Sequence, residues 1–416
     1  MTGTASAPAT GARVTVDVGV VLAIAVAALG YFVDVFDILL YGIVRVRSLT
    51  DLGVPAAAQL EIGVSLLNWQ NAGLLIGGVA FGIWGDRGGR RSVLFGSILL
   101  YSVANLVNAA ATSVELYRAC RFVAGLGLAG ELGAGVVLVA ELMPTQVRGY
   151  GTAIIATFGF CGGLVAPLVG GLPWRTAYVV GGVAGLVILL LRLAVQESGL
   201  FRKLERTNVP RGNLLLLFGS WSRTWRFVRA FLTGVPIWFA IGILVILAPE
   251  VGKSLGVSGA ISVPRLLFMM YLGFVLGDMA SGLLSQALRS RRWVMLIDLV
   301  ILAVTVGVML GASGLTPEQY AWLCLPLGLA SGYWVLFVTS AAEQFGTNLR
   351  ATVAISLPNF VRGAIIPMTL ALRALIPRVG IRTGAIAIGA VCIGVAFLAM
   401  LQTPETFDRD LDYLEE

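Results

Sequence analysis

Twelve long apolar segments dominate this sequence and constrain its fold more than any other feature. Hydrophobic residues make up 58% of the 416 residues and charged residues only 12%, about half the charged share of a soluble domain. A helix needs about 20 mostly apolar residues to cross the hydrocarbon core of a membrane. Segments of this kind span residues 18–44, 59–84, 92–113, 116–141, 149–171, 175–195, 227–250, 262–288, 293–312, 318–342, 351–375 and 380–402. We therefore predict an all-α polytopic membrane protein with twelve transmembrane helices.

The longest break between these segments divides them into two sets of six. It covers residues 196–226, a basic and partly amphipathic stretch that we expect to be a cytoplasmic linker with an interfacial segment. The predicted organisation is a cytoplasmic tail (1–17), a six-helix bundle (18–195), the linker, a second six-helix bundle (227–402) and an acidic cytoplasmic tail (403–416). Lys and Arg gather in the tails and after even-numbered helices, as at 87–91, 202–206 and 289–292. This bias predicts that both termini face the cytoplasm.

The two sets of six also repeat each other. The segment "AELMPTQVRG" (140–149) aligns with "AEQFGTNLRA" (342–351), and "GIWGDRGGRR" (82–91) aligns more weakly with "GLLSQALRSR" (282–291). Each pair follows equivalent helices, the fourth and tenth or the second and eighth. Segments displaced by half the chain indicate duplicated transporter halves related by an axis along the membrane normal.

The residue inventory excludes several other classes of protein. The chain contains no histidine, and its four cysteines (120, 161, 324 and 392) are isolated in apolar segments without metal-ligand spacing. Without a nucleophile–base set or a metal cluster, nothing indicates an enzyme. The net charge of +7 is accounted for by the basic loops of a membrane protein rather than by nucleic-acid binding.

The loop after the second helix carries a family resemblance. "GIWGDRGGRR" resembles the G-x3-D-R-x-G-R-R signature of the major facilitator superfamily, and "RFVAGLGLAGE", "ELMPTQVRG" and "TPETFDRDLDYLE" extend the resemblance along the whole chain. Within the superfamily the chain looks most like proton-coupled metabolite, aromatic-acid and sugar porters and organic-ion transporters. The resemblance implies a multi-pass protein of the bacterial inner (plasma) membrane that works as a monomer by alternating access. It also implies a small-molecule substrate, no cofactor, and the proton as coupling ion.

Two carboxylates, Asp34 and Asp37, stand in the first apolar segment, "GYFVDVFDILLYG". A charge at the centre of a spanning helix costs about 2.5–3.5 kcal/mol on the mildest scale, so a cationic partner is expected. Arg121 in the fourth segment lies at a similar depth, and we predict an Asp–Arg121 pair that faces the cavity between the halves. In the resembled porters an Asp and an Arg at the positions of Asp37 and Arg121 form the proton-coupling pair. The alternative is a static pair that joins the two helices.

Three more ionisable residues lie inside apolar segments. Glu131 has no partner in the sequence, so it is either a second proton carrier or a protonated structural residue. Arg362 cannot lose its proton and therefore needs an anion, either Asp278 or a substrate carboxylate. Position 323, which corresponds to Arg121 in the repeat, is Leu. Proton chemistry is therefore predicted in the first half and substrate selection in the second.

Other polar and aromatic residues are candidates for the cavity and for a cytoplasmic gate. Possible cavity-lining residues are Tyr41, Asn68, Gln70, Asn71, Trp238, Trp334 and Asn359, although each alone is more often a packing residue. By resemblance, Asp86 caps the eleventh helix and Arg87, Arg90 and Arg91 bind acids or lipid headgroups. The expected gate ion pairs are Glu141–Arg148 and Glu343–Arg350.

These residues together predict a secondary active transporter. The favoured function is proton-driven symport of a small organic solute, with a carboxylate metabolite preferred because of Arg362. The alternative is a proton-coupled antiporter that exports a drug, organic cation or metabolite. It is supported by "GGLVAPLVGG" (162–171), which resembles an element of proton-coupled drug exporters, although Gly and Pro there can simply permit a kink and close packing.

Overall fold

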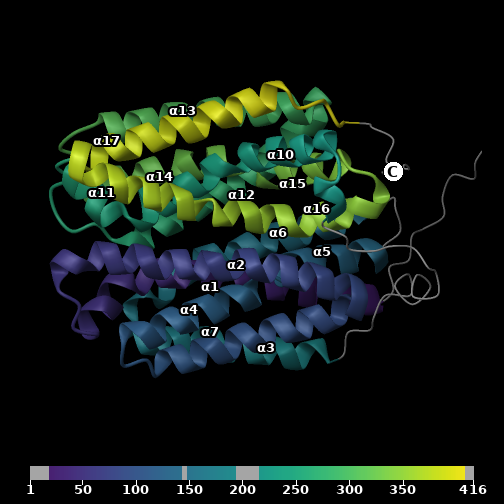
Figure 1. Ribbon diagram of the computed structural model, residues 1–416, viewed down its shortest axis with the longest axis horizontal. Helices are drawn as coiled ribbons and strands as arrows, with labels where there is room; N and C mark the ends of the chain where they lie inside the picture. The colour runs from purple at the N-terminus through teal and green to yellow at the C-terminus, as the bar shows by residue number, and fades with distance from the viewer. Residues whose placement is uncertain (1–17, 143–147, 194–214, 408–416) are drawn as a thin grey trace, which may run out of the picture.

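The computed structural model describes residues 18–142, 148–193 and 215–407, and this part of the chain is built of helices and turns without strands. Figure 1 shows two helical bundles side by side, the purple and blue helices below and the green and yellow helices above. The first bundle contains α1 (Val18–Asp51), η1 (Ala56–Ala58), α2 (Gln59–Gly88), α3 (Arg90–Ala109), α4 (Val114–Leu128), α5 (Glu131–Leu142), α6 (Arg148–Val165), η2 (Ala166–Gly171) and α7 (Trp174–Arg192). The second contains α9 (Leu215–Phe218), α10 (Trp221–Phe239), η3 (Ala240–Ile246), α11 (Ala248–Ser254), α12 (Val263–Leu288), α13 (Arg291–Gly311), α14 (Pro317–Ser331), α15 (Trp334–Glu343), α16 (Thr347–Gly363) and α17 (Ile365–Leu401).

Ten helical segments of the described residues are long and apolar enough to cross a membrane. The fourth apolar run is divided between α4 and α5, and the last two runs are joined in one segment, Thr352–Leu401. That segment reverses at Gly380, which has φ 77° and ψ 164°. A Cβ on Gly384 would lie 3.1 Å from Leu372, whereas twelve residues of straight helix span about 18 Å. The twelve-helix count and the cytoplasmic placement of both termini stay predictions.

The fourth and tenth apolar runs are broken at equivalent positions. α4 ends at Leu128 and α5 starts at Glu131, while α14 ends at Ser331 and α15 starts at Trp334, 203 positions later in each case (128 to 331 and 131 to 334). This spacing is close to the 202-residue offset of the sequence repeat, so the duplication extends to backbone geometry.

Close backbone contacts repeat in the same way. A Cβ on Gly73 or Gly77 of α2 would come within 2.4 Å of a carbonyl oxygen of α4, and a Cβ on Gly273 or Gly277 of α12 would come within 2.0 Å of one of α14. Such distances are below any real contact, so only glycine lets these helix pairs approach, as small residues do generally between membrane helices. Each half therefore contains the same tightly packed helix pair.

The predicted domain boundaries fall partly outside the described residues. The tails 1–17 and 408–416 and linker residues 196–214 are not among them. Within the rest of the predicted linker, α10 already begins at Trp221, whose ring stacks on that of Trp225 with centroids 6.2 Å apart. Both tryptophans are exposed, as expected for aromatic residues at a membrane interface. Between the bundles, α2 and α5 pack against α16, and α6 packs against α12.

Candidate functional site

A small cavity lies between the two bundles. Its wall is mostly aromatic and aliphatic and contains one charged side chain, Arg362 of α16. The lining residues are Tyr31, Val35, Ile38, Phe160, Ile237, Trp238, Ile241, Tyr271, Phe274, Trp334 and Arg362. They come from both halves, so any change in how the halves meet changes the cavity.

The guanidinium of Arg362 faces a carboxylate of the opposite half. Arg362 Nη2 lies 3.5 Å from Asp34 Oδ2, and both side chains are buried. Neither carboxylate oxygen of Asp34 has a hydrogen-bond partner among the described residues. The structure pairs Arg362 with Asp34 and not with Asp278, which was one of its two predicted partners; the other, a substrate carboxylate, stays a prediction. Asp34 holds Arg362 by charge at a distance longer than a good hydrogen bond, which leaves the guanidinium able to bind another anion.

Asp37 and Arg121 belong to one cluster but do not touch directly. The Asn105 amide of α3 donates to Asp37 Oδ1, and Arg121 donates to the Asn105 carbonyl oxygen. Arg121 also stacks on Tyr178, with its guanidinium carbon 4.5 Å from the ring centroid. These partners all come from the first half, and Asp37 and Arg121 are fully buried there. The predicted direct pair facing the inter-half cavity is thus corrected to an amide-bridged pair inside the first bundle.

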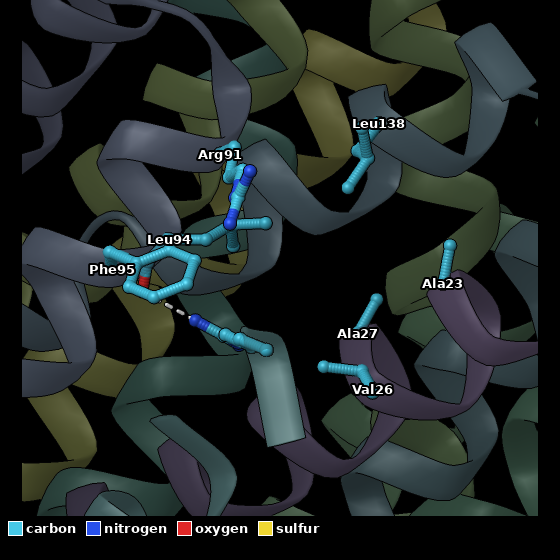
Figure 2. A pocket seen from close by; sticks show the side chains of 8 residues that line it. Ala23, Val26, Ala27, Arg91, Leu94, Phe95 and Leu138 are labelled. Carbon is cyan, nitrogen blue, oxygen red and sulfur yellow. Dashed lines mark hydrogen bonds between the residues drawn. The ribbon is translucent and has the colours of Figure 1, made fainter. Parts of the chain in front are cut away.

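Glu131 has a strong partner that the sequence did not indicate. Arg192 of α7 donates to both of its carboxylate oxygens, at 3.0 Å and 2.5 Å, and Ser97 donates to one of them. Arg192 also donates to the Leu94 carbonyl oxygen. Figure 2 shows the crevice beside this pair, with Ala23 and Ala27 across from Leu94 and Phe95. The expectation of an unpaired glutamate is wrong, because a charged group 61 positions away in sequence meets it.

Asp278 belongs to α12 and packs against the break between α14 and α15. Its Oδ1 accepts from the Val335 backbone N–H at 3.4 Å, and the residue is 8% exposed. A second buried carboxylate of the same half, Asp298, accepts from Ser281 at 2.7 Å. Neither has a basic side chain within ion-pair distance in the described part of the chain.

The structure places only some of the predicted cavity residues in the cavity. Trp238 and Trp334 line it together with Arg362. The others bond elsewhere: Tyr41 to the Gly63 carbonyl, Gln70 to Ile38, Asn71 to Leu67, Asn68 to Thr369, and Asn359 to the Ala129 carbonyl. The Asn359 bond, 3.0 Å long, crosses between the halves and ends at the break before Glu131. Asn359 also accepts from Arg362 at 3.5 Å, so it lies beside the cavity as an inter-half contact.

The predicted cytoplasmic gate is described only in part. The side chains of Asp86, Arg87, Arg90, Glu141, Arg148 and Arg350 lie outside the described residues. Glu343 forms an ion pair with Arg291 at 2.8 Å. Arg91 donates to the Leu193 carbonyl at 3.5 Å and lies over the Phe95 ring.

Two ion pairs that the sequence did not predict join the halves at the opposite end, where α1 terminates. Arg45 Nη2 lies 2.8 Å from both carboxylate oxygens of Glu250, and Arg373 pairs with Glu61. Arg45 is 1% exposed, whereas Arg373 and Glu61 are about 60% exposed. Glu61 and Glu250 lie in the first turns of α2 and α11, where acidic residues are common, so only their juxtaposition with Arg373 and Arg45 identifies the pairs. The cavity is closed at this end by paired charges.

Comparison with known proteins identifies the kind of molecule to which this cavity belongs. The family model of the Major Facilitator Superfamily matches residues 20–357. The niacin transporter NiaP of Acinetobacter baylyi is 26% identical over 361 residues, covering 78% of this chain and 80% of that protein. A probable 4-methylmuconolactone transporter of Cupriavidus pinatubonensis is 26% identical over 339 residues, covering 78% of this chain and 76% of that protein. The crystal structure of a D-xylose-proton symporter superposes with a TM-score of 0.71 at 18% identity, covering 94% of this chain and all of the other, and thus shares the fold.

Proposed function

Because the chain belongs to the Major Facilitator Superfamily, whose members are membrane transporters and not enzymes, we propose that it couples uptake of a small organic carboxylate to proton entry. The protein is a multi-pass integral membrane protein. We place it in the bacterial inner membrane, with both termini in the cytoplasm, and we expect the monomer to be the working unit.

The observation that carries this proposal is the single guanidinium in an aromatic cavity. Arg362 is buried, its charged partner is 3.5 Å away, and Tyr31, Phe160, Trp238, Tyr271 and Trp334 surround the same space. A guanidinium binds a carboxylate through two parallel hydrogen bonds, and aromatic walls favour a flat ring. A small aromatic or cyclic monocarboxylate fits both features. The named substrates of the two relatives, niacin and 4-methylmuconolactone, are small ring compounds.

Proton coupling follows from competition for Arg362. A substrate carboxylate that binds Arg362 takes the cation from Asp34, which is fully buried. An unpaired carboxylate at that depth is costly, and uptake of one proton removes the cost. Substrate anion and proton would then cross together. Asp37, held by Asn105 and Arg121, is proposed as the neighbouring group whose protonation is tied to the same movement.

Alternating access fits the closed end of the cavity. If the N-terminus faces the cytoplasm, the Arg45–Glu250 and Arg373–Glu61 pairs lie on the outer side. The described conformation is then closed to the outside, and both pairs must separate before substrate can enter. Major facilitator transporters of this two-half type move one half against the other around a fixed site.

The test uses purified protein in liposomes that contain a pH-sensitive dye. Nicotinate and benzoate serve as probes under an imposed pH gradient, and symport predicts acidification of the lumen that depends on the probe. Arg362→Ala should lower carboxylate uptake at least tenfold, since truncating one partner of a buried charge pair costs about 2–5 kcal/mol. Arg265→Ala, which removes an exposed guanidinium paired with Glu318 within the same half, is the control. Equal uptake by Arg362→Ala and wild type would refute the assignment.

One observation supports the antiport alternative. The Gly- and Pro-containing segment predicted from exporters forms the bend from α6 into η2, and a Cβ on Gly163 would clash with Tyr271 of the cavity wall. A bend that contacts the substrate space is compatible with export of a larger molecule. Antiport predicts alkalinisation of the lumen in the same dye assay, so the sign of the pH change separates the two functions.

A further inference from the structure

The buried carboxylates of the two halves differ in how their charge is compensated. In the first half, Asp34 faces Arg362, Asp37 is linked to Arg121 through Asn105, and Glu131 is bonded by Arg192. In the second half, Asp278 and Asp298 have no such cation in the part of the chain that the structure describes, although they are only 8% and 5% exposed.

This difference determines which acids hold a proton. A carboxylate buried without a cation costs several kcal/mol in its charged form and becomes neutral instead. In the first half a guanidinium lies beside Asp34 and beside Glu131 and is linked to Asp37 through Asn105. Asp278 and Asp298 are therefore neutral, protonated acids in the described conformation.

Of these two acids, Asp278 is the one in contact with α15, a helix that lines the cavity between the halves. Asp298 of α13 accepts a hydrogen bond of 2.7 Å from Ser281 of α12. Asp278 of α12 packs against the break in the tenth run, because Gly332 in that break lies directly against Gly277 and the Asp278 backbone nitrogen. The neighbouring residue at the start of α15, Trp334, lines the central cavity.

Asp278 also has a partner ready for its ionised form. The Val335 N–H points at Oδ1 from 3.4 Å, too long for a strong hydrogen bond in the neutral state. Val335 lies in the first turn of α15, where the helix dipole favours a negative charge. A small approach of α15 would shorten this bond and stabilise the carboxylate.

The positively charged groups near α12 are bonded to other partners, because Arg265 pairs with Glu318, Arg291 pairs with Glu343, and Arg292 donates to the Leu401 carbonyl. Tyr31 of α1 lies within electrostatic range of Asp278, and Asp298 is the acid of α13. Around them, α6 carries Cys161, α14 carries Glu318, Tyr320 and Cys324, α15 carries Glu343 paired with Arg291, and α13 begins with Arg291 and Arg292.

We propose that Asp278 is a second proton-binding site, in the C-terminal half and separate from the Asp34–Arg362 pair. This proposal rests on the proton coupling proposed above. When the halves rearrange and water enters beside α15 from the cytoplasmic side, the Asp278 carboxyl gives its proton to that water, and the Val335 N–H and the first turn of α15 hold the carboxylate. When the halves next open to the outside, the carboxylate takes up a hydrated proton from the outer solution and α15 relaxes. Each cycle thereby carries one proton in addition to the one tied to substrate binding.

The first test needs no substrate. Infrared spectra of the purified protein show the carbonyl stretch of protonated carboxyl groups, and this band shifts when H₂O is replaced by D₂O. The difference between the wild-type and variant spectra, recorded in each solvent, identifies the carboxyl group that a substitution removes. Asp278→Asn should remove a protonated-carboxyl band that is sensitive to D₂O, while the control Asp298→Asn leaves that band in place. An unchanged band in Asp278→Asn would overturn the proposal. If Asp278→Asn does not fold, Asp278→Glu should keep the band at a shifted frequency, and an unshifted band would overturn the proposal equally.

The second test measures coupling in liposomes at zero membrane potential, with benzoate or nicotinate as the probe. Loss of one coupled proton should lower the accumulation ratio of Asp278→Asn about tenfold for each pH unit of gradient, while Asp298→Asn accumulates like wild type. A wild type that couples protons and an Asp278→Asn variant with the same ratio would refute the second site alone. A wild type without any probe-dependent proton flux would refute the proposed function, whereas the infrared result would still decide whether Asp278 is protonated.

Discussion

The Arg45–Glu250 ion pair offers a direct measure of what holds the halves together at one end. Arg45 is 1% exposed and lies 2.8 Å from both oxygens of Glu250, which is 22% exposed. Glu250→Gln keeps the size and polarity of the side chain but leaves a buried guanidinium without its anion. We expect this variant to populate the conformation that is open at this end far more than wild type.

The size of the effect follows from burial. Removing one partner of a fully buried pair costs about 3–5 kcal/mol, and the partial exposure of Glu250 reduces this to about 1.5–3 kcal/mol, because solvent screens part of the attraction. Since about 1.4 kcal/mol is a factor of ten, the ratio of open to closed molecules should rise roughly ten- to a hundredfold. The exposed Arg373–Glu61 pair contributes only about 0–1 kcal/mol. Glu61→Gln is therefore the matched control.

Spin labels on the two halves report the opening. Thr50 at the end of α1 and Lys253 in α11 are exposed, and cysteines placed there, in a background with the four native cysteines changed to alanine, carry the labels. Pulsed electron–electron distance distributions should gain a long-distance population in Glu250→Gln and stay close to wild type in Glu61→Gln. Identical distributions for Glu250→Gln and wild type, or an equal shift in Glu61→Gln, would refute the reasoning from burial.

Three further predictions concern coupling and local stability. Asp37→Asn should abolish concentrative uptake but spare counterflow exchange, as measured with labelled benzoate in liposomes; wild-type accumulation would remove Asp37 from the mechanism. Asn359→Ala should slow exchange several-fold with little change in the half-saturating benzoate concentration, because it removes the inter-half bond to Ala129. Ser356→Ala should leave exchange unchanged, because among the described residues the Ser356 hydroxyl bonds to Thr352 of its own helix. A change in half-saturation alone would make Asn359 a substrate contact. Partial burial acts to raise the pKa of Glu405, but hydrogen bonds from Ser290 and from three backbone N–H groups outweigh it and lower the pKa. Because the folded-state pKa is the lower one, this contact stabilises the C-terminal segment above about pH 4–5 and is lost as pH falls further. The hydrogen-exchange protection near Thr406, corrected for the pH dependence of the intrinsic exchange rate, should therefore fall on acidification in wild type and be low at all pH values in Glu405→Gln.

The membrane-protein class and the two-half design could be predicted from the sequence because they depend on long-range averages. Hydropathy over about 20 residues and the repeat offset survive local variation. The breaks after Leu128 and Ser331 could not be predicted, because Gly130 and Gly332 stand in apolar stretches and glycine is frequent inside membrane helices that are not broken. They are imposed by tertiary packing, such as Gly332 against Gly277.

The partners of the buried charges were harder to predict than the charges themselves. Asp34, Asp37, Glu131 and Arg362 stand out as ionisable residues in apolar segments, and each is buried in the structure. Arg121 was predicted as the partner of Asp37 because both lie at a similar depth in the membrane. Depth does not specify how each helix is rotated about its axis, and in the structure the Asn105 amide lies between the two side chains. Asn105 is one of several amides in apolar segments and gives no signal by itself. Arg192 lies near the end of the apolar segment 175–195 and gives no signal by itself either.

The paired glycine contacts of α2 with α4 and of α12 with α14 have a consequence for how this molecule can evolve. Where these backbones touch, there is no room for a new side chain, so substitutions that alter the substrate must fall on the faces that line the cavity. Substitution of a wall residue such as Trp238 or Trp334 can then change which solute binds, while the two tightly packed helix pairs keep their contacts. A new substrate should therefore arise by substitution of cavity-wall residues, while the glycine contacts between the helices stay unchanged.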